Sequence, residues 1–140
     1  MEHRKDKCVL IVDGGLPLGL AANTAAILGI TIGQRHPEAV GVDVADGTGE
    51  AHLGIIETPV PVLKGEPERL KTLRQRLREA EFSEVTAVDF SDLAQSCRTY
   101  MEFQEKMQAV PEDGLQYLGL GLYGPKKLID RLTGSLPLLR

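Results

Sequence analysis

Short apolar runs, each bounded by glycine, proline or charged residues, recur along most of the chain. Residues 7–13 form a continuous apolar run that ends in an acid, which is the pattern of a buried strand. Residues 84–90 and 115–123 predict two further strands, and the first of these has Asp89 at its end. Residues 59–63 contain two prolines, which favour an extended segment at the edge of a sheet. Residues 40–46 and 51–57 flank Gly47-Thr48-Gly49 and predict a hairpin.

Helical patterns lie between these predicted strands. Residues 20–32 are rich in Ala and Leu and predict a buried helix, while residues 66–81 have leucines at helical spacing and Pro67 in the first turn. Ser91 is a suitable cap for a helix that we expect to run to about residue 109. Residues 124–134 begin with Gly-Pro and end with Gly, which predicts a last short helix.

The alternation of strands and helices indicates the α/β class. We expect a mixed β-sheet with helices on both faces, formed by a single domain over residues 1–140. The apolar tail, residues 136–140, is predicted to pack on this domain or on another subunit.

Composition narrows the class of protein. A net charge of −4 argues against a general nucleic-acid binder, because such proteins need a large positive field. No apolar run reaches the length of a membrane span, and the polar start of the sequence is not that of a signal peptide. Cys8 and Cys97 show no disulfide spacing, so we expect reduced thiols and a cytoplasmic protein.

Residues 119–124 match the glycine pattern of dinucleotide-binding loops. Only sixteen residues follow Gly124, too few for the rest of that fold, so we reject this interpretation. Instead, the glycines predict a strand that packs closely against a helix. No cofactor is expected, and His3, His36 and His52 lack metal-ligand spacing with each other or with the cysteines, so no metal site is expected.

Two segments are candidate sites for a small anionic ligand. The glycine-containing turn at residues 14–19 would present amides at a helix start, although it is equally compatible with a plain tight turn. Lys126 and Lys127 begin the last helix, where the helix dipole disfavours cations. A bound phosphate would resolve that conflict, and the alternative is a pair of solvated surface lysines.

Asp89 is the candidate catalytic residue, because an acid at the end of a central strand lies where α/β sites gather. The alternative is that Asp89 or Ser91 merely caps the next helix. Asn23 and Thr24 are polar residues in an apolar helix, and either a ligand or nearby backbone would satisfy them. The candidate ligand-binding residues are Asn23, Thr24, Gln95, Tyr123 and Lys126.

The segments KCVLIVD, LPLGLAANTAAILG, GIIETPVPVLKG, VDFSDLAQSCRTY and YLGLGLYGPKKLIDRLTGSLPLLR resemble an uncharacterised family, the domain of unknown function numbered two thousand. The resemblance covers nearly the whole chain. That family is in turn similar to type 2 peptidyl-tRNA hydrolases. Those enzymes share the opening strand, the Ala-rich helix, a strand ending in Lys as at Lys64, a strand ending in Asp as at Asp89, and a Gly-Pro-led final helix ending in Thr-Gly.

The hydrolase resemblance implies that fold, a homodimer and tRNA as the one plausible nucleic-acid partner. It also implies roles for Asp89 and Gln95. The hydrolases carry a lysine at the start of the first helix, where this sequence has Leu20. A leucine cannot pair with a phosphate, so the retained fold does not carry the activity with it.

Three functional hypotheses follow. The first is a ligand-binding module that lacks hydrolase chemistry. The second is a hydrolase of an acyl ester on tRNA or on a small substrate, with Asp89 activating water and Gln95 or Asn23 positioning the carbonyl. The third is a structural or partner-binding protein that acts through its apolar C-terminal tail.

Overall fold

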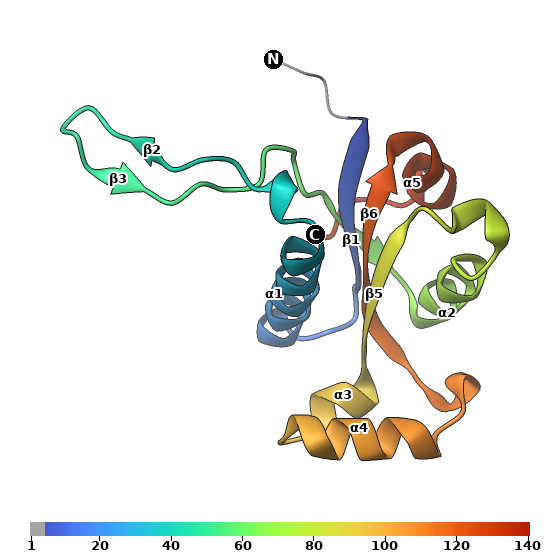
Figure 1. Ribbon diagram of the computed structural model, residues 1–140. Helices are drawn as coiled ribbons and strands as arrows, with labels where there is room; N and C mark the ends of the chain where they lie inside the picture. The colour runs from blue at the N-terminus through green and yellow to red at the C-terminus, as the bar shows by residue number, and fades with distance from the viewer. Residues whose placement is uncertain (1–4) are drawn as a thin grey trace.

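A four-stranded mixed sheet forms the centre of the protein. The computed structural model describes residues 5–140, and its sheet contains β1 (Asp6–Asp13), β4 (Val62–Gly65), β5 (Thr86–Ser91) and β6 (Tyr117–Pro125) in the order β4-β1-β6-β5 (Figure 1). β4 is parallel to β1, whereas β6 is antiparallel to both of its neighbours. The predicted mixed sheet is therefore confirmed.

Helices cover both faces of this sheet, as the sequence predicts. α1 (Leu18–Arg35) packs on one face, and α2 (Pro67–Arg76) and α5 (Lys126–Thr133) pack on the other (Figure 1). Two separate apolar clusters result, one on each side of the sheet. Within the described part of the chain, no helix is long and apolar enough to span a membrane.

The glycines of β6 allow α1 to approach the sheet closely. A Cβ atom on Gly119 would lie 2.7 Å from Thr24 Cγ2, and one on Gly121 would lie 2.9 Å from Ile32 Cδ1. Real Cβ atoms do not approach neighbours so closely, so the helix could not sit at this depth over larger residues. The predicted packing role of these glycines is confirmed.

The predicted hairpin forms a long arm that projects from the body (Figure 1). Its paired segments are β2 (Val44–Ala45) and β3 (Ala51–His52), and a further bridge joins Val40 to Ile56 at its base. Gly49 has φ +88° in the turn, a conformation that L side chains rarely adopt. The arm leaves the body through the 3-10 turn Pro37–Ala39, directly after α1.

The single helix predicted after Ser91 is wrong, because the segment forms two helices below the end of β5. Ser91 does cap α3 (Asp92–Ser96), since its hydroxyl accepts from the Ala94 amide at 3.2 Å. The chain then becomes extended, and Thr99 caps α4 (Tyr100–Ala109) by accepting from the Glu102 amide at 3.1 Å. The Thr-x-x-Glu pattern of a capping box therefore marks a second start. Two further 3-10 turns, Ala80–Phe82 and Glu112–Gly114, follow α2 and α4.

The apolar tail lies against the outer edge of β4. The Lys64 amide donates to the Pro137 carbonyl at 2.8 Å, and the Leu139 amide donates to the Val62 carbonyl at 2.9 Å. Leu136 packs on the apolar cluster beneath α2 and α5. Of the two locations predicted for the tail, the chain's own body is the one that the structure shows.

Cys8 is buried in β1, and its burial raises the pKa of the thiol to about 11 from its ordinary value of 9.0. At a pH between these two pKa values, the thiol loses its proton in the unfolded chain and keeps it in the folded protein. The folded state then binds more protons, so the free energy of unfolding falls as the pH rises. We expect a loss of about 2 kcal/mol between about pH 9 and pH 11.

Urea unfolding across that pH window measures this loss. Lysines and tyrosines also titrate there, so the comparison is with Cys8→Ala, whose stability should fall less steeply because it lacks the thiol. Cys97→Ala is the matched control, since Cys97 is partly exposed and should leave the slope of the wild type unchanged. Parallel slopes in wild type and Cys8→Ala would contradict the prediction.

Candidate functional site

The carboxyl ends of three strands meet at one edge of the sheet. β1 and β4 are parallel, and β5 runs in the same direction because both β1 and β5 are antiparallel to β6. In open α/β sheets, ligands bind outside the carboxyl ends of the strands. Two hollows open along this edge, one beside β1 and β4 and one beside β5 and β6.

The first hollow, of about 480 Å³, is lined by the ends of β1 and β4 and the start of α2. Its cation is Lys64, which follows the buried Leu63 in β4 and is exposed. The aliphatic part of Lys64 lies against Gly14, where an added Cβ would come within 2.4 Å of its Cδ atom. Lys64 thus extends across the turn that leads into α1, and it forms no ion pair within residues 5–140.

Asp13 shapes the turn in the same hollow. Its side chain is only 8% exposed, and its Oδ1 atom accepts from the Gly15 amide at 2.8 Å. The Gly14 amide donates to the Gly65 carbonyl at 3.1 Å, so these glycine amides are used within the fold. The helix that follows has no side-chain cap and no acid in its first turn. The first amides of α1 therefore have no side-chain acceptor, but this segment lines the hollow only as far as Gly15.

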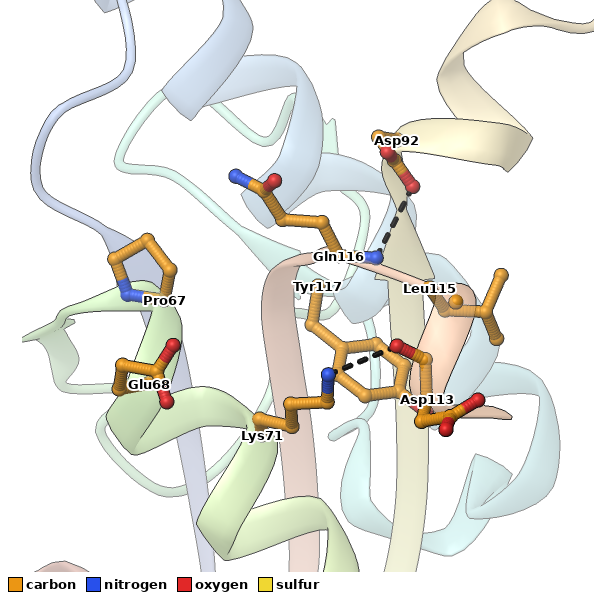
Figure 2. A pocket seen from close by; sticks show the side chains of 9 residues that line it. Pro67, Glu68, Lys71, Asp92, Asp113, Leu115, Gln116 and Tyr117 are labelled. Atoms are coloured by element: carbon orange, nitrogen blue, oxygen red, sulfur yellow. Dashed lines mark hydrogen bonds between the residues drawn. The ribbon is translucent and has the colours of Figure 1, made fainter. Parts of the chain in front are cut away.

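The second hollow, of about 220 Å³, lies between the start of α2 and the segment that enters β6 (Figure 2). Asp92 Oδ1 accepts from the Gln116 amide at 3.2 Å and from the Leu93 amide at 2.8 Å. Lys71 Nζ donates to the Asp113 carbonyl at 2.9 Å. Asp92 and Lys71 are thus already engaged in holding the walls together, unlike Lys64.

Asp89 lies on the face of the sheet that carries α2. Its Oδ2 atom accepts from Arg74 Nε at 2.9 Å, and the two side chains are only 25% and 15% exposed. Beside this pair, Arg78 binds both carboxylate oxygens of Glu112, and Tyr117 donates to Glu112 at 2.7 Å. These contacts hold the pKa of Glu112 below its usual range, whereas burial and the Glu112 contact raise the pKa of Tyr117. The Arg74 contact ties α2 to β5, and the Glu112 contacts tie the turn after α2 to β6.

The other predicted site residues are spread over the molecule. Thr24 is buried and donates to the Leu20 carbonyl at 2.8 Å, while Tyr123 is buried and stacks on His36 at 4.2 Å between ring centroids. Asn23 and Gln95 are exposed on different helices, α1 and α3. Lys126 lies at the opposite edge of the sheet and pairs with Asp130 at 2.7 Å. The structure does not bring these residues together with Asp89.

Lys126 has a partner within its own helix. Asp130 receives Lys126 at one carboxylate oxygen and Lys7 at the other, each at 2.7 Å, and these contacts lower its pKa. The acid one turn on therefore offsets a lysine at a helix start. Within residues 5–140 no group of three or more His, Cys, Asp or Glu side chains is arranged to hold a metal ion.

Asp13 and Lys64 were not identified as site residues by sequence reasoning, although both end predicted strands. Their proximity depends on the parallel pairing of β1 with β4, in which Val12 lies opposite Lys64 and Asp13 opposite Gly65. The sequence does contain a signal for this site. Two apolar runs end in a charged residue followed by Gly, one at Asp13 and the other at Lys64. Parallel pairing of those two runs would have placed both ends in one hollow.

Comparison with known proteins assigns the chain to a family. Residues 6–140 match the family described as protein of unknown function (DUF2000). The chain belongs to that family. A solved structure of a protein of unknown function, Atu0240 from Agrobacterium tumefaciens strain C58, is similar over 97% of this chain and 98% of its own, with a TM-score of 0.87 and 20% sequence identity. That likeness shows the fold. No curated protein gives a significant match.

Proposed function

We propose that this DUF2000 protein is a ligand-binding module that takes a small anionic ligand in the hollow at the ends of β1 and β4. The observation that carries the proposal is Lys64, an exposed cation without an ion pair in the described residues, laid across the Gly14 turn at the start of α1. An exposed ammonium group that no described carboxylate pairs with attracts an anion, and the hollow at the carboxyl ends of β1 and β4 has room for a small one.

We further propose that the fold is of the type 2 peptidyl-tRNA hydrolase kind. The order of β1, α1, β4, α2, β5, β6 and α5 supports this, because it is the order that the sequence resemblance implies. Leu20 occupies the position of the hydrolase lysine and is half-buried against the cluster beneath α1. Lys64 at the end of β4 supplies a cation that suits binding of an anion, and it does not replace the missing lysine at the start of α1.

The hydrolase hypothesis with Asp89 has weaker support. A general base must be free to accept a proton, whereas Asp89 already accepts a charge-assisted hydrogen bond from Arg74. Asn23 and Gln95, which were to position the carbonyl, are exposed on separate helices. We therefore expect no hydrolysis of an N-acylated aminoacyl-tRNA. If the wild type hydrolyses this substrate and Asp89→Asn does not, the hydrolase hypothesis would replace the ligand-binding proposal.

Thermal unfolding with inorganic phosphate tests the anion site. A ligand at tenfold excess over its Kd stabilises the native state by about 1.4 kcal/mol, which raises Tm by about 4 °C in a domain of this size. We expect this saturable rise in the wild type and its loss in Lys64→Met. Acetate and phosphorylated metabolites, tested in the same way, distinguish a phosphate from a carboxylate ligand.

Lys127→Met is the comparison variant, because Lys127 is an exposed lysine of the other candidate anion segment, at the start of α5, and it should keep the full response if the ligand binds beside Lys64. Phosphate also stabilises proteins nonspecifically. Equal responses of wild type, Lys64→Met and Lys127→Met would therefore reject the site.

We also propose, from the hydrolase resemblance and the reduced thiols, that the protein is a cytoplasmic homodimer.

A further inference from the structure

The two outer strands of the sheet, β4 and β5, differ in how their outward backbone groups are covered. The tail pairs with β4 and satisfies its outer edge, whereas β5, at the other end of the strand order, has no neighbour among residues 5–140. The Lys126 amide donates to the Lys5 carbonyl, and in an antiparallel pair every second residue bonds the same neighbouring strand. The backbone groups of Gly124 and of every second residue before it in β6 therefore point toward β1. The β6 residues between them, which include Gly121 opposite Val88, direct their backbone groups toward β5. Val88 therefore bonds β6, and the amides and carbonyls of its neighbours Ala87 and Asp89 point outward from the sheet.

An apolar groove runs along this open edge. Its main part, of about 480 Å³, lies between α1, β5 and α4, and an adjoining part of about 290 Å³ continues toward the end of α1. The two parts share Thr31, Val88 and Asp89. Arg35 and Arg98 line opposite ends and form no ion pair within the described residues. Its apolar lining comes from Ile27, Val88, Phe90, Ala94, Tyr100 and Phe103.

The hairpin arm has the complementary chemistry. Every residue from 42 to 53 is exposed, yet Val42, Leu53 and Ile55 are apolar and 84%, 83% and 79% exposed. Residues 40–56, which form the arm, hold three acids and no Lys or Arg, and one of these acids, Asp46, pairs with His52 at 2.8 Å. An exposed apolar arm marks an interaction surface, and its acidic charge matches the two arginines of the groove.

We propose that the hairpin arm of a second copy of this chain lies in the groove beside β5. One strand of the arm would extend the sheet through the outward groups of Ala87 and Asp89. Val42, Leu53 and Ile55 would fill the apolar lining, and the acids would face Arg35 and Arg98. The chain's own arm projects away from its body, so a partner copy is the source of the arm (Figure 1).

This inference rests on the proposed homodimer and names the surfaces that form it; it does not depend on the anion site. Light scattering should give about twice 15.2 kDa for the full chain. Ile55→Asp on the arm and Tyr100→Asp in the groove should each return the mass to that of one chain. Both positions are exposed, so circular dichroism should show an unchanged fold. Leu18→Asp is the matched control, since Leu18 is 87% exposed on neither surface and should leave the dimer intact.

Mixing the two disrupted variants gives the sharpest result. If each copy contributes one arm and one groove, the intact arm of Tyr100→Asp fits the intact groove of Ile55→Asp. The mixture should therefore recover dimers that neither variant forms alone. Dimers built from two arms or from two copies of α1 would not be restored in this way.

Cys97 reports on the groove directly, because it lines the groove and is partly exposed. A thiol reagent should label it about tenfold more slowly in the dimer than in Ile55→Asp, since labelling then needs the small open fraction. A dimer that persists in Ile55→Asp would overturn the arm-in-groove inference while keeping the homodimer. A wild type of 15.2 kDa at every concentration would overturn both.

Discussion

Gly119→Val should lower the free energy of unfolding by about 3 kcal/mol. The added Cβ would lie 2.7 Å from Thr24 Cγ2, 3.0 Å from the Ile11 carbonyl oxygen and 3.1 Å from Leu28 Cδ1. The Ile11 oxygen belongs to the central strand, so it cannot move aside without disturbing the ladder. Thr24 cannot rotate freely either, because its hydroxyl donates to the Leu20 carbonyl. Urea unfolding at neutral pH measures the change.

Two variants check that crowding is the cause. Thr24→Ser keeps the hydroxyl and removes the crowding methyl group, so it should recover about 1 kcal/mol when combined with Gly119→Val. Gly29→Ala lies on the same helix where an added Cβ meets nothing within 4 Å. It should raise stability by up to about 1 kcal/mol, because alanine is the better helix former. Additive effects of Thr24→Ser and Gly119→Val would show that these residues do not compete for the same space.

The sequence predicts the sheet and most helices because each depends on a local pattern. Apolar runs identify β1, β5 and β6, and leucine spacing identifies α2. The helix of residues 66–81 is nevertheless too long, since α2 ends at Arg76. The break at Cys97 was missed because apolar residues continue through it. A second capping signal at Thr99 and Glu102 decides that boundary.

The candidate site could be predicted only in part, because it depends on contacts between distant residues. The Arg74–Asp89 pair requires that Asp89 face α2, which the register of an edge strand decides. Lys64 lies over Gly14, fifty positions away in the sequence, only because β4 pairs with β1. By contrast, the Lys126–Asp130 pair is a one-turn spacing that could be read from the sequence.

Removing residues 136–140 should lower the free energy of unfolding by about 3 kcal/mol. Two backbone hydrogen bonds to β4 are lost, together with the burial of Leu136 on the cluster beneath α2 and α5. The deletion also exposes the outer edge of β4, so the truncated protein should aggregate more readily on heating. Thermal and urea unfolding, with light scattering during the scan, measure both effects.

The control is removal of Arg140 alone, which makes neither of those hydrogen bonds and should change stability by less than about 0.5 kcal/mol. Leu136→Ser should lie between the two, because it loses apolar burial and keeps the backbone pairing. If the truncated chain unfolds like the wild type, the tail does not stabilise the sheet and the partner-binding hypothesis regains its place. If the truncated chain is destabilised as expected, its failure to bind a partner would reflect the damaged edge of β4. The partner-binding hypothesis must then be tested with point variants at exposed tail positions such as Leu138.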